Sequence, residues 1–128
     1  MVKSIVIKQN DSYEVIEMES CDLDKLQSIV DGYIEWIDID HSNSSGYYVN
    51  EEGKFNKEMN NLATKWWHWN LLKVRESLTG FNDCISGDVV YTKLDETGAE
   101  CSLSDEEIEE FKLFTIAYQT MTQSQKEN

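Results

Sequence analysis

The chain has 128 residues, a length that fits one domain built around one hydrophobic core. Its 25 acidic residues outnumber its 11 basic ones, and the net charge of −14 disfavours non-specific binding to nucleic-acid phosphates. The three cysteines lack paired spacing and the two histidines are too few for a zinc motif, so neither a disulfide framework nor a zinc site is expected. The chain also has no apolar run of about 18 residues, the length of a membrane span. We therefore expect a cytoplasmic protein with reduced thiols.

Patterns of apolar residues predict eight secondary-structure elements. Strands are expected where apolar and polar residues alternate, and helices where apolar residues recur at about 100° per residue. Ser20 or Asp22 can cap the first helix, and Gly32 lies where this helix needs a left-handed stop. In chain order the expected elements are strands 2–8 and 13–18, a helix at 23–30, strands 33–40 and 46–51, a helix at 57–77, a strand at 87–94 and a helix after Ser104.

The last helix has the clearest start signal, because Ser104 and Glu107 form a capping box. The order ββαββαβα, without proline, repeats or a linker, predicts an α+β fold with an antiparallel or mixed sheet and three helices. We expect a single domain over residues 1–122. Residues 123–128 are expected to form a frayed tail.

The helix at 57–77 carries three tryptophans with different expected environments. Stepping about 100° per residue places Trp66 and Trp67 on the apolar side, where aromatic residues pack in a core. Trp69 falls at the polar edge of the helix. Lys65 and Lys73 lie four residues before and after Trp69, so both ammonium groups can approach its ring.

Charge is distributed unevenly around this helix. Residues 54–75 contain five basic residues and one acidic residue, a local charge of +4, which leaves −18 on the rest of the chain. This segment either binds an anionic ligand or a partner, with Trp69 as the anchor, or only neutralises neighbouring carboxylates. The candidate binding residues are Trp69, Lys65, Lys73, Arg75 and His68.

The sequence contains no motif that selects a catalytic residue. It has no GxSxG, no HExxH and no glycine-rich phosphate loop, and nothing distinguishes one cysteine as a nucleophile. We therefore expect no enzymatic activity, no cofactor and no metal site.

Four short stretches resemble the motifs of one known family, in the family's order. The chain is similar to domain of unknown function 3846, a small family from phages and from bacteria that carry mobile elements. It departs from the family pattern at Met59, where proline is usual, and in its tryptophan cluster. The resemblance covers most of the chain, to about Glu110. The matching stretches are LQSIVDGYIE at 26–35, NEEGK at 50–54, NNLAT at 60–64 and ISGDVV at 85–90.

The resemblance implies a phage or mobile-element origin and no established activity. The leading hypothesis is a non-enzymatic accessory protein that binds and inhibits a host protein, in host takeover or counter-defence. Its interface would be the acidic surface, the Trp69 edge of the helix, or both. One alternative is a module that binds a small anionic nucleotide signal at Lys65, Lys73 and Arg75. A second alternative is an acidic mimic of DNA, although the acidic residues are spread over many elements instead of following phosphate spacing. An unrecognised enzyme is the least favoured, and the oligomeric state is left open.

Overall fold

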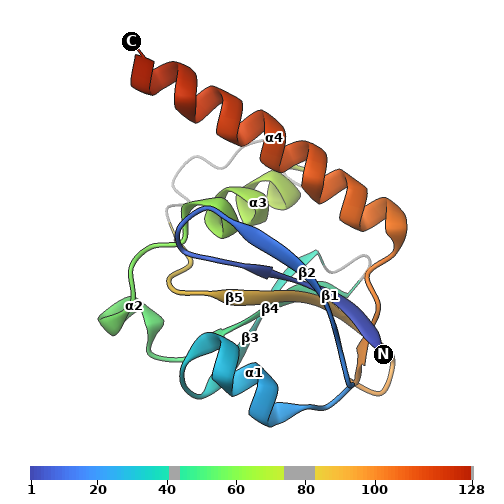
Figure 1. The fold of residues 1–128 in the computed structure, drawn as a ribbon. Helices are drawn as coiled ribbons and strands as arrows, with labels where there is room; N and C mark the ends of the chain where they lie inside the picture. Colours follow the sequence, from blue (N-terminus) through green and yellow to red (C-terminus); the bar gives the residue numbers. More distant parts are fainter. Residues whose placement is uncertain (41–43, 74–82, 128) are drawn as a thin grey trace.

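The alternating segments of the chain assemble into one antiparallel sheet with helices on both faces (Figure 1). The computed structural model describes residues 1–40, 44–73 and 83–127. The strand order is β2-β1-β5-β4-β3, and β6 pairs with the end of β5. The elements are β1 Val2–Ile7, β2 Tyr13–Met18, α1 Leu23–Val30, β3 Ile34–Asp40, β4 Ser45–Asn50, α2 Gly53–Asn56, α3 Asn61–Leu72, β5 Val89–Leu94, β6 Glu100–Cys101 and α4 Asp105–Glu127. The predicted α+β fold is confirmed.

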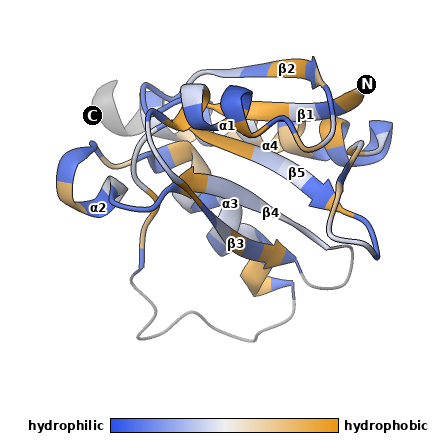
Figure 2. Ribbon diagram, turned by 90° about the horizontal axis from the view of Figure 1, so that it is seen from below, coloured by the Kyte–Doolittle hydropathy of each residue, from blue (hydrophilic) through white to orange (hydrophobic). Residues whose placement is uncertain are grey.

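Successive strand residues point to opposite faces of the sheet and so build two separate cores. Tyr47 and Tyr91 point to the face that is covered by α3 and α4, where they join Trp66 and Phe111. Tyr48 and Val90 point to the other face, which α1 covers. Figure 2, seen from the α1 side, shows hydrophobic residues along β1 and the start of β5 beneath α1.

Both predicted capping signals can be compared with the structure. The Ser104 amide donates to Glu107 Oε1 at 2.9 Å, and the Glu107 amide donates to Ser104 Oγ at 3.1 Å, so the capping box is confirmed. Asp22 caps α1 by accepting from the Lys25 amide. The left-handed residue at the end of α1 is Asp31, with φ 60°, and not Gly32 as predicted.

The tryptophan helix begins later than its apolar pattern predicts. Lys57 has an extended backbone and Met59 pairs with Ser86 as an isolated bridge, so α3 starts at Asn61 behind its N-cap Asn60. Met59 is 45% exposed. A tertiary pairing therefore overrides the helical periodicity of the first turn.

Two short elements of the structure were not predicted from the sequence. The one-turn α2 replaces an expected turn, and the two-residue β6 lies where no strand was expected. The described chain therefore has four helices instead of three.

Two further predictions concern the ends of helices. The expected end of the tryptophan helix, from residue 74, lies outside the described residues. The backbone of α4 is helical to Glu127, and the fraying of residues 123–128 stays a prediction. Among the described residues, no helix combines the length and the apolar character needed to span a membrane.

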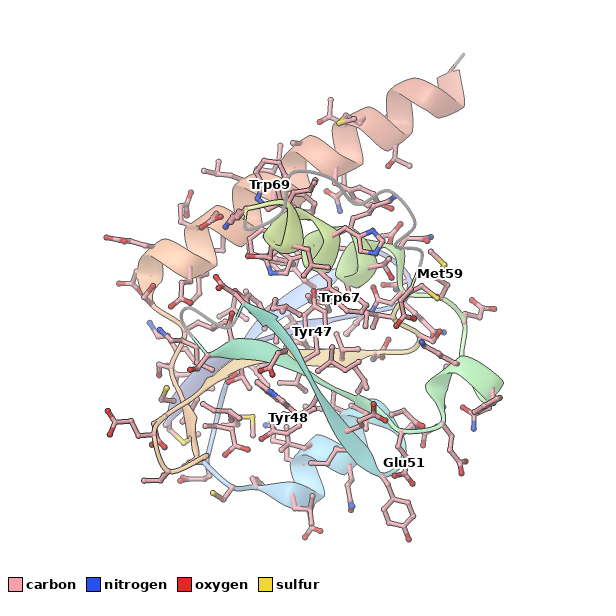
Figure 3. The ribbon with its side chains drawn as sticks, turned by 180° about the vertical axis from the view of Figure 1, so that it is seen from behind. Tyr47, Tyr48, Glu51, Met59, Trp67 and Trp69 are labelled. Atoms are coloured by element: carbon pink, nitrogen blue, oxygen red, sulfur yellow. The ribbon has the colours of Figure 1, made fainter. Side chains whose placement is uncertain are left out.

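Helix α4 is held on the sheet by its first half. The Tyr13 ring meets Phe111 edge to face at 5.1 Å, and Lys93 pairs with Glu107 at 3.0 Å. Further along, Gln119 donates to the backbone oxygen of Asp11. The last turns of α4 extend beyond the rest of the fold (Figures 1 and 3), which leaves one side of the helix open.

Candidate functional site

An open groove with a volume of about 860 Å³ lies between α3 and α4. Its α3 wall is formed by Lys65, His68, Trp69 and Leu72, which share one side of a helix because they are spaced i, i+3, i+4 and i+7. Figure 3 shows Trp69 on the side of α3 that faces α4, whereas Trp67 lies toward the sheet. The α4 wall consists of Glu110, Leu113, Phe114, Ala117, Tyr118, Met121 and Thr122.

Large apolar side chains in this groove are exposed to solvent. Trp69 is 46% exposed, and Leu72, Leu113 and Met121 are 44%, 59% and 64% exposed. The Trp69 ring lies 6.0 Å from the ring of Phe114, which also lines the groove. Soluble proteins seldom expose contiguous apolar surface unless it binds something.

The three tryptophans of α3 have the burial that helical spacing predicts. Trp66 and Trp67 are only 1% and 8% exposed, in contrast to the half-exposed Trp69. Trp66 packs edge to face on Phe111 at 5.3 Å and lies 6.0 Å from Tyr91, so it belongs to the core. Only Trp69 of this cluster offers its ring to a binding partner.

The structure places the predicted cations differently from one another. Lys65 lines the groove, is exposed and makes no ion pair with any described residue. Lys73 does not flank Trp69 as expected: it pairs with Glu110 of α4, and its Nζ lies 5.6 Å from the centre of the Trp66 ring. Arg75 lies outside the described residues. His68 is half-buried, and its Nε2 donates to the backbone oxygen of Asp83 at 2.9 Å.

Most of the basic segment is neutralised by carboxylates from other elements. Lys54 pairs with Asp83, and Lys57 pairs with Asp31 at 2.5 Å. The hydrogen bond from Lys57 lowers the pKa of the Asp31 carboxyl. Together with the pairing of Lys73, these contacts leave Lys65 as the basic side chain of residues 54–73 that makes no ion pair within the described chain. Within residues 54–73, three of the four lysines are therefore paired, and their charges do not gather in a basic patch.

A smaller hollow of about 360 Å³ lies between α2, the strands β3 and β4, and residues 83–86. It contains the Lys54–Asp83 ion pair, Cys84 and the edge of Trp67. Phe55 of α2 borders it and is 91% exposed. This hollow was not predicted, and its cation is already paired.

The stretches that resemble family motifs hold structural junctions together. Asn60, fully buried, accepts from the Ala63 amide at 3.0 Å and donates to the backbone oxygens of Ile7 and Gly87 at 2.9 and 2.8 Å. Thr64 accepts from the Ile85 amide at 2.9 Å. These bonds tie the start of α3 to β1 and to the segment before β5, which satisfies buried backbone groups.

A second motif stretch ties the end of α1 to β4. Asn50 donates to the backbone oxygens of Val30 and Asp31 at 3.2 and 2.9 Å and accepts from the Glu52 amide. A Cβ at Gly32 would lie 2.5 Å from Asn50 Nδ2, so a side chain there would displace the Asn50 amide from its bonds to Val30 and Asp31. These motif residues thus connect the end of α1 to β4.

One buried carboxylate also has a structural explanation. Glu100, 7% exposed, accepts from the Cys21 amide and the Tyr48 hydroxyl, each at 2.8 Å. Burial alone raises the pKa of Glu100, but these hydrogen bonds outweigh it and hold the pKa below its usual value. The carboxylate anchors β6 to the turn before α1.

Sequence reasoning missed the whole α4 wall of the groove. The available signal was the composition of residues 113–125, which contain no charged residue although 28% of the chain is charged. Leu113, Ala117 and Met121 recur every four residues in this stretch and form one helical stripe.

The chain belongs to the family described as domain of unknown function (DUF3846), whose model matches residues 2–115. No curated protein and no solved structure matches the chain. The family match ends within α4, so Ala117, Tyr118 and Met121 of the groove lie beyond it. The groove is therefore a feature of this chain, and the family match covers only part of its α4 wall.

Proposed function

We propose that the protein is a non-enzymatic accessory protein of a phage or mobile element, which inhibits a host protein by binding it at the α3–α4 groove. The exposed apolar lining of the groove is the observation that carries this proposal. Trp69, Leu72, Leu113 and Met121 are each about half exposed or more. Covering them would contribute roughly 3–6 kcal/mol, because complete burial of one such side chain contributes about 1.5–3 kcal/mol.

The arrangement of side chains supports a protein partner over a small anion. An anion site needs several free cations, and the Lys73 ammonium is already paired with Glu110. A protein interface instead needs an aromatic anchor within an apolar centre and a polar rim. Trp69 supplies the anchor, and Lys65 and His68 supply the rim on α3.

The polar groups of the groove also support a binding role over catalysis. A nucleophile requires a base within hydrogen-bond reach. In the described lining, His68 Nε2 is bonded to a backbone oxygen, and the Thr122 hydroxyl donates to the backbone oxygen of Tyr118. These bonds use the groups for structure.

The test compares two exposed aromatic residues by capture from a host-cell lysate. Trp69→Ala removes the proposed anchor, and Phe55→Ala is the matched control because Phe55 is 91% exposed on α2, outside the groove. The wild type and Phe55→Ala should retain the same host protein, and Trp69→Ala should lose it while melting within a few degrees of the wild type. The captured protein should lose activity when the wild type is added.

Three results contradict the proposal. Loss of the partner with Phe55→Ala but not with Trp69→Ala would place the interface at α2. Retention by both variants would show that neither ring anchors the partner. Absence of any captured protein from the natural host would refute partner binding.

A further inference from the structure

Strand β2 lies at one end of the sheet, and its outer edge is open. The strand order β2-β1-β5-β4-β3 gives β2 one pairing partner, β1, among the described strands. Figure 2 shows β2 as the outermost strand, with no described element beyond it. An outer strand presents a row of backbone N–H and C=O groups that can pair with a further strand.

Hydrogen bonds of β1 determine which residues of β2 face this open edge. The Lys3 backbone bonds to residues 102 and 103, and the Ile7 oxygen accepts from Asn60, so both residues point away from β2. Because this direction alternates along an antiparallel pair, the even-numbered residues of β1 and β2 bond to each other. The backbone groups of the odd-numbered residues of β2 therefore point outward, and no described residue bonds to them: Tyr13, Val15 and Glu17.

Strand β2 lacks the features that usually protect an outer strand from pairing. Proteins block such edges with proline, with lysine or with a β-bulge. Strand β2 contains neither proline nor lysine, and it pairs with β1 over 6 residues without a register shift. At the other end of the sheet, the pairing of β3 is interrupted between Asp38 and Asp40. Of the two outer strands, β2 is therefore the one that can accept another strand.

The side chains of β2 determine the chemistry of the incoming strand. Its centre is Glu14-Val15-Ile16-Glu17, in which both glutamates are exposed and Val15 is 39% exposed. Glu17 makes no ion pair with any described residue, and Glu14 has a contact of 4.0 Å with Lys8. Side chains directly opposite each other in neighbouring strands interact, and opposite charges there are stabilising. The complementary segment therefore has the order basic–apolar–apolar–basic, which is the same in both chain directions.

The same pattern opposes antiparallel pairing with a second copy of β2. Outward-facing residues must pair with outward-facing residues, so only a few registers are possible. With Tyr13 opposite Val15, the two Glu14 side chains lie directly opposite each other, and with Val15 opposite Val15 they are diagonal neighbours. The next two registers bring the two Glu17 side chains together in the same ways. Like charges at these positions are destabilising, and the net charge of −14 on each copy adds to the repulsion.

We infer that β2 binds an extended segment of a partner protein by strand addition, and that this segment has the order basic–apolar–apolar–basic. Its Lys or Arg residues lie opposite Glu14 and Glu17, and its apolar residues lie opposite Val15 and Ile16. Backbone hydrogen bonds to the outward-facing groups provide affinity, and the side chains provide specificity. No residue of β2 lines the α3–α4 groove, so this edge is a second binding surface.

Hydrogen exchange of the full chain, followed by NMR, tests whether the edge is open. In the free protein, the amides of Val15 and Glu17 should exchange at least tenfold faster than that of Ile16, because only Ile16 bonds to β1. The probe is the capped peptide Thr-Lys-Val-Val-Lys-Thr at low salt, which should slow the exchange of Val15 and Glu17.

Matched peptides and variants test the recognition. A peptide with Glu in place of both Lys residues should bind at least tenfold more weakly. The double variant Glu14→Lys, Glu17→Lys should reverse this preference. The variant Glu51→Lys, Glu52→Lys makes an equal change of charge at exposed residues after β4 and should keep it. Of two Lys peptides N-methylated at alternate amides, one should lose at least tenfold in affinity, because only one set of amides faces β2.

Several results would overturn the inference. Slow exchange of Val15 and Glu17 in the free protein would show that the edge is covered. Absence of binding by the Lys peptide, equal binding of the two N-methylated peptides, or a charge preference that Glu14→Lys, Glu17→Lys leaves unchanged would contradict strand addition. A wild-type dimer in light scattering that Val15→Lys dissociates would make a second copy the occupant. None of these results depends on Trp69, so the inference and the proposed function can fail separately.

Discussion

Replacing Asn60 by alanine tests whether the NxxAT stretch is structural or functional. The side chain of Asn60 caps α3 and donates two hydrogen bonds, to the backbone oxygens of Ile7 and Gly87. Alanine removes all three bonds at a fully buried position. A functional residue would lose activity and keep its stability, whereas a structural one loses stability first.

The expected cost follows from the three bonds. Loss of an N-cap costs about 1 kcal/mol. Each buried carbonyl left without its partner costs about 1–3 kcal/mol. The sum of about 3–5 kcal/mol, allowing for partial relaxation, is a large share of the roughly 5–15 kcal/mol that stabilises a domain. It corresponds to a fall in Tm on the order of 10–20 °C.

Thermal and urea unfolding of three variants separate the contributions. Asn60→Asp keeps the capping oxygen but cannot donate two bonds, so it should be at least as unstable as Asn60→Ala at pH 7. Asn61→Ala is the matched control, because Asn61 is exposed at the next position, and it should change stability by less than about 0.5 kcal/mol. If Asn60→Ala melts within about 3 °C of the wild type, the structural explanation of this stretch is wrong.

Three further outcomes are expected. In urea unfolding, Trp66→Ala should lower the free energy of unfolding by about 3–5 kcal/mol, and Trp69→Ala by about 1 kcal/mol or less. The reason is that only the Trp66 ring is fully buried. Equal losses would make Trp69 a core residue. Gly46→Ala should lower the urea midpoint by the equivalent of about 2 kcal/mol or more, because the added Cβ would lie 2.3 Å from the backbone oxygen of Ile37. An unchanged midpoint would refute this packing. The lowered pKa of Glu100 means that its stabilisation is complete above its ordinary value of 4.5 and is lost as pH falls through the lower folded value. The stability difference between wild type and Glu100→Gln should therefore shrink below about pH 4.5, and a difference that grows there would contradict the sign.

Local signals in the sequence were sufficient for most elements and their buried faces. Alternation predicts β1 and β2, strand-like runs beside turn residues predict β3 to β5, and the capping box at Ser104 predicts the start of α4. All these signals depend on residues a few positions apart. The same spacing distinguishes the buried Trp66 from the half-exposed Trp69. In each case the residues that give the signal lie within a few positions of the structure that they predict.

The groove and the ion pairing of its charged residues depend on contacts between residues that are far apart in the sequence. Lys73 pairs with Glu110, 37 positions away, so neighbouring sequence could not show that its charge is neutralised. Met59 leaves the helix to pair with Ser86, a competition that helical periodicity does not contain. Periodicity states which face of a helix is apolar, but not which element lies opposite that face. The α3–α4 groove exists because the sheet seats both helices on one side and leaves part of each apolar face uncovered, and only the tertiary structure decides that.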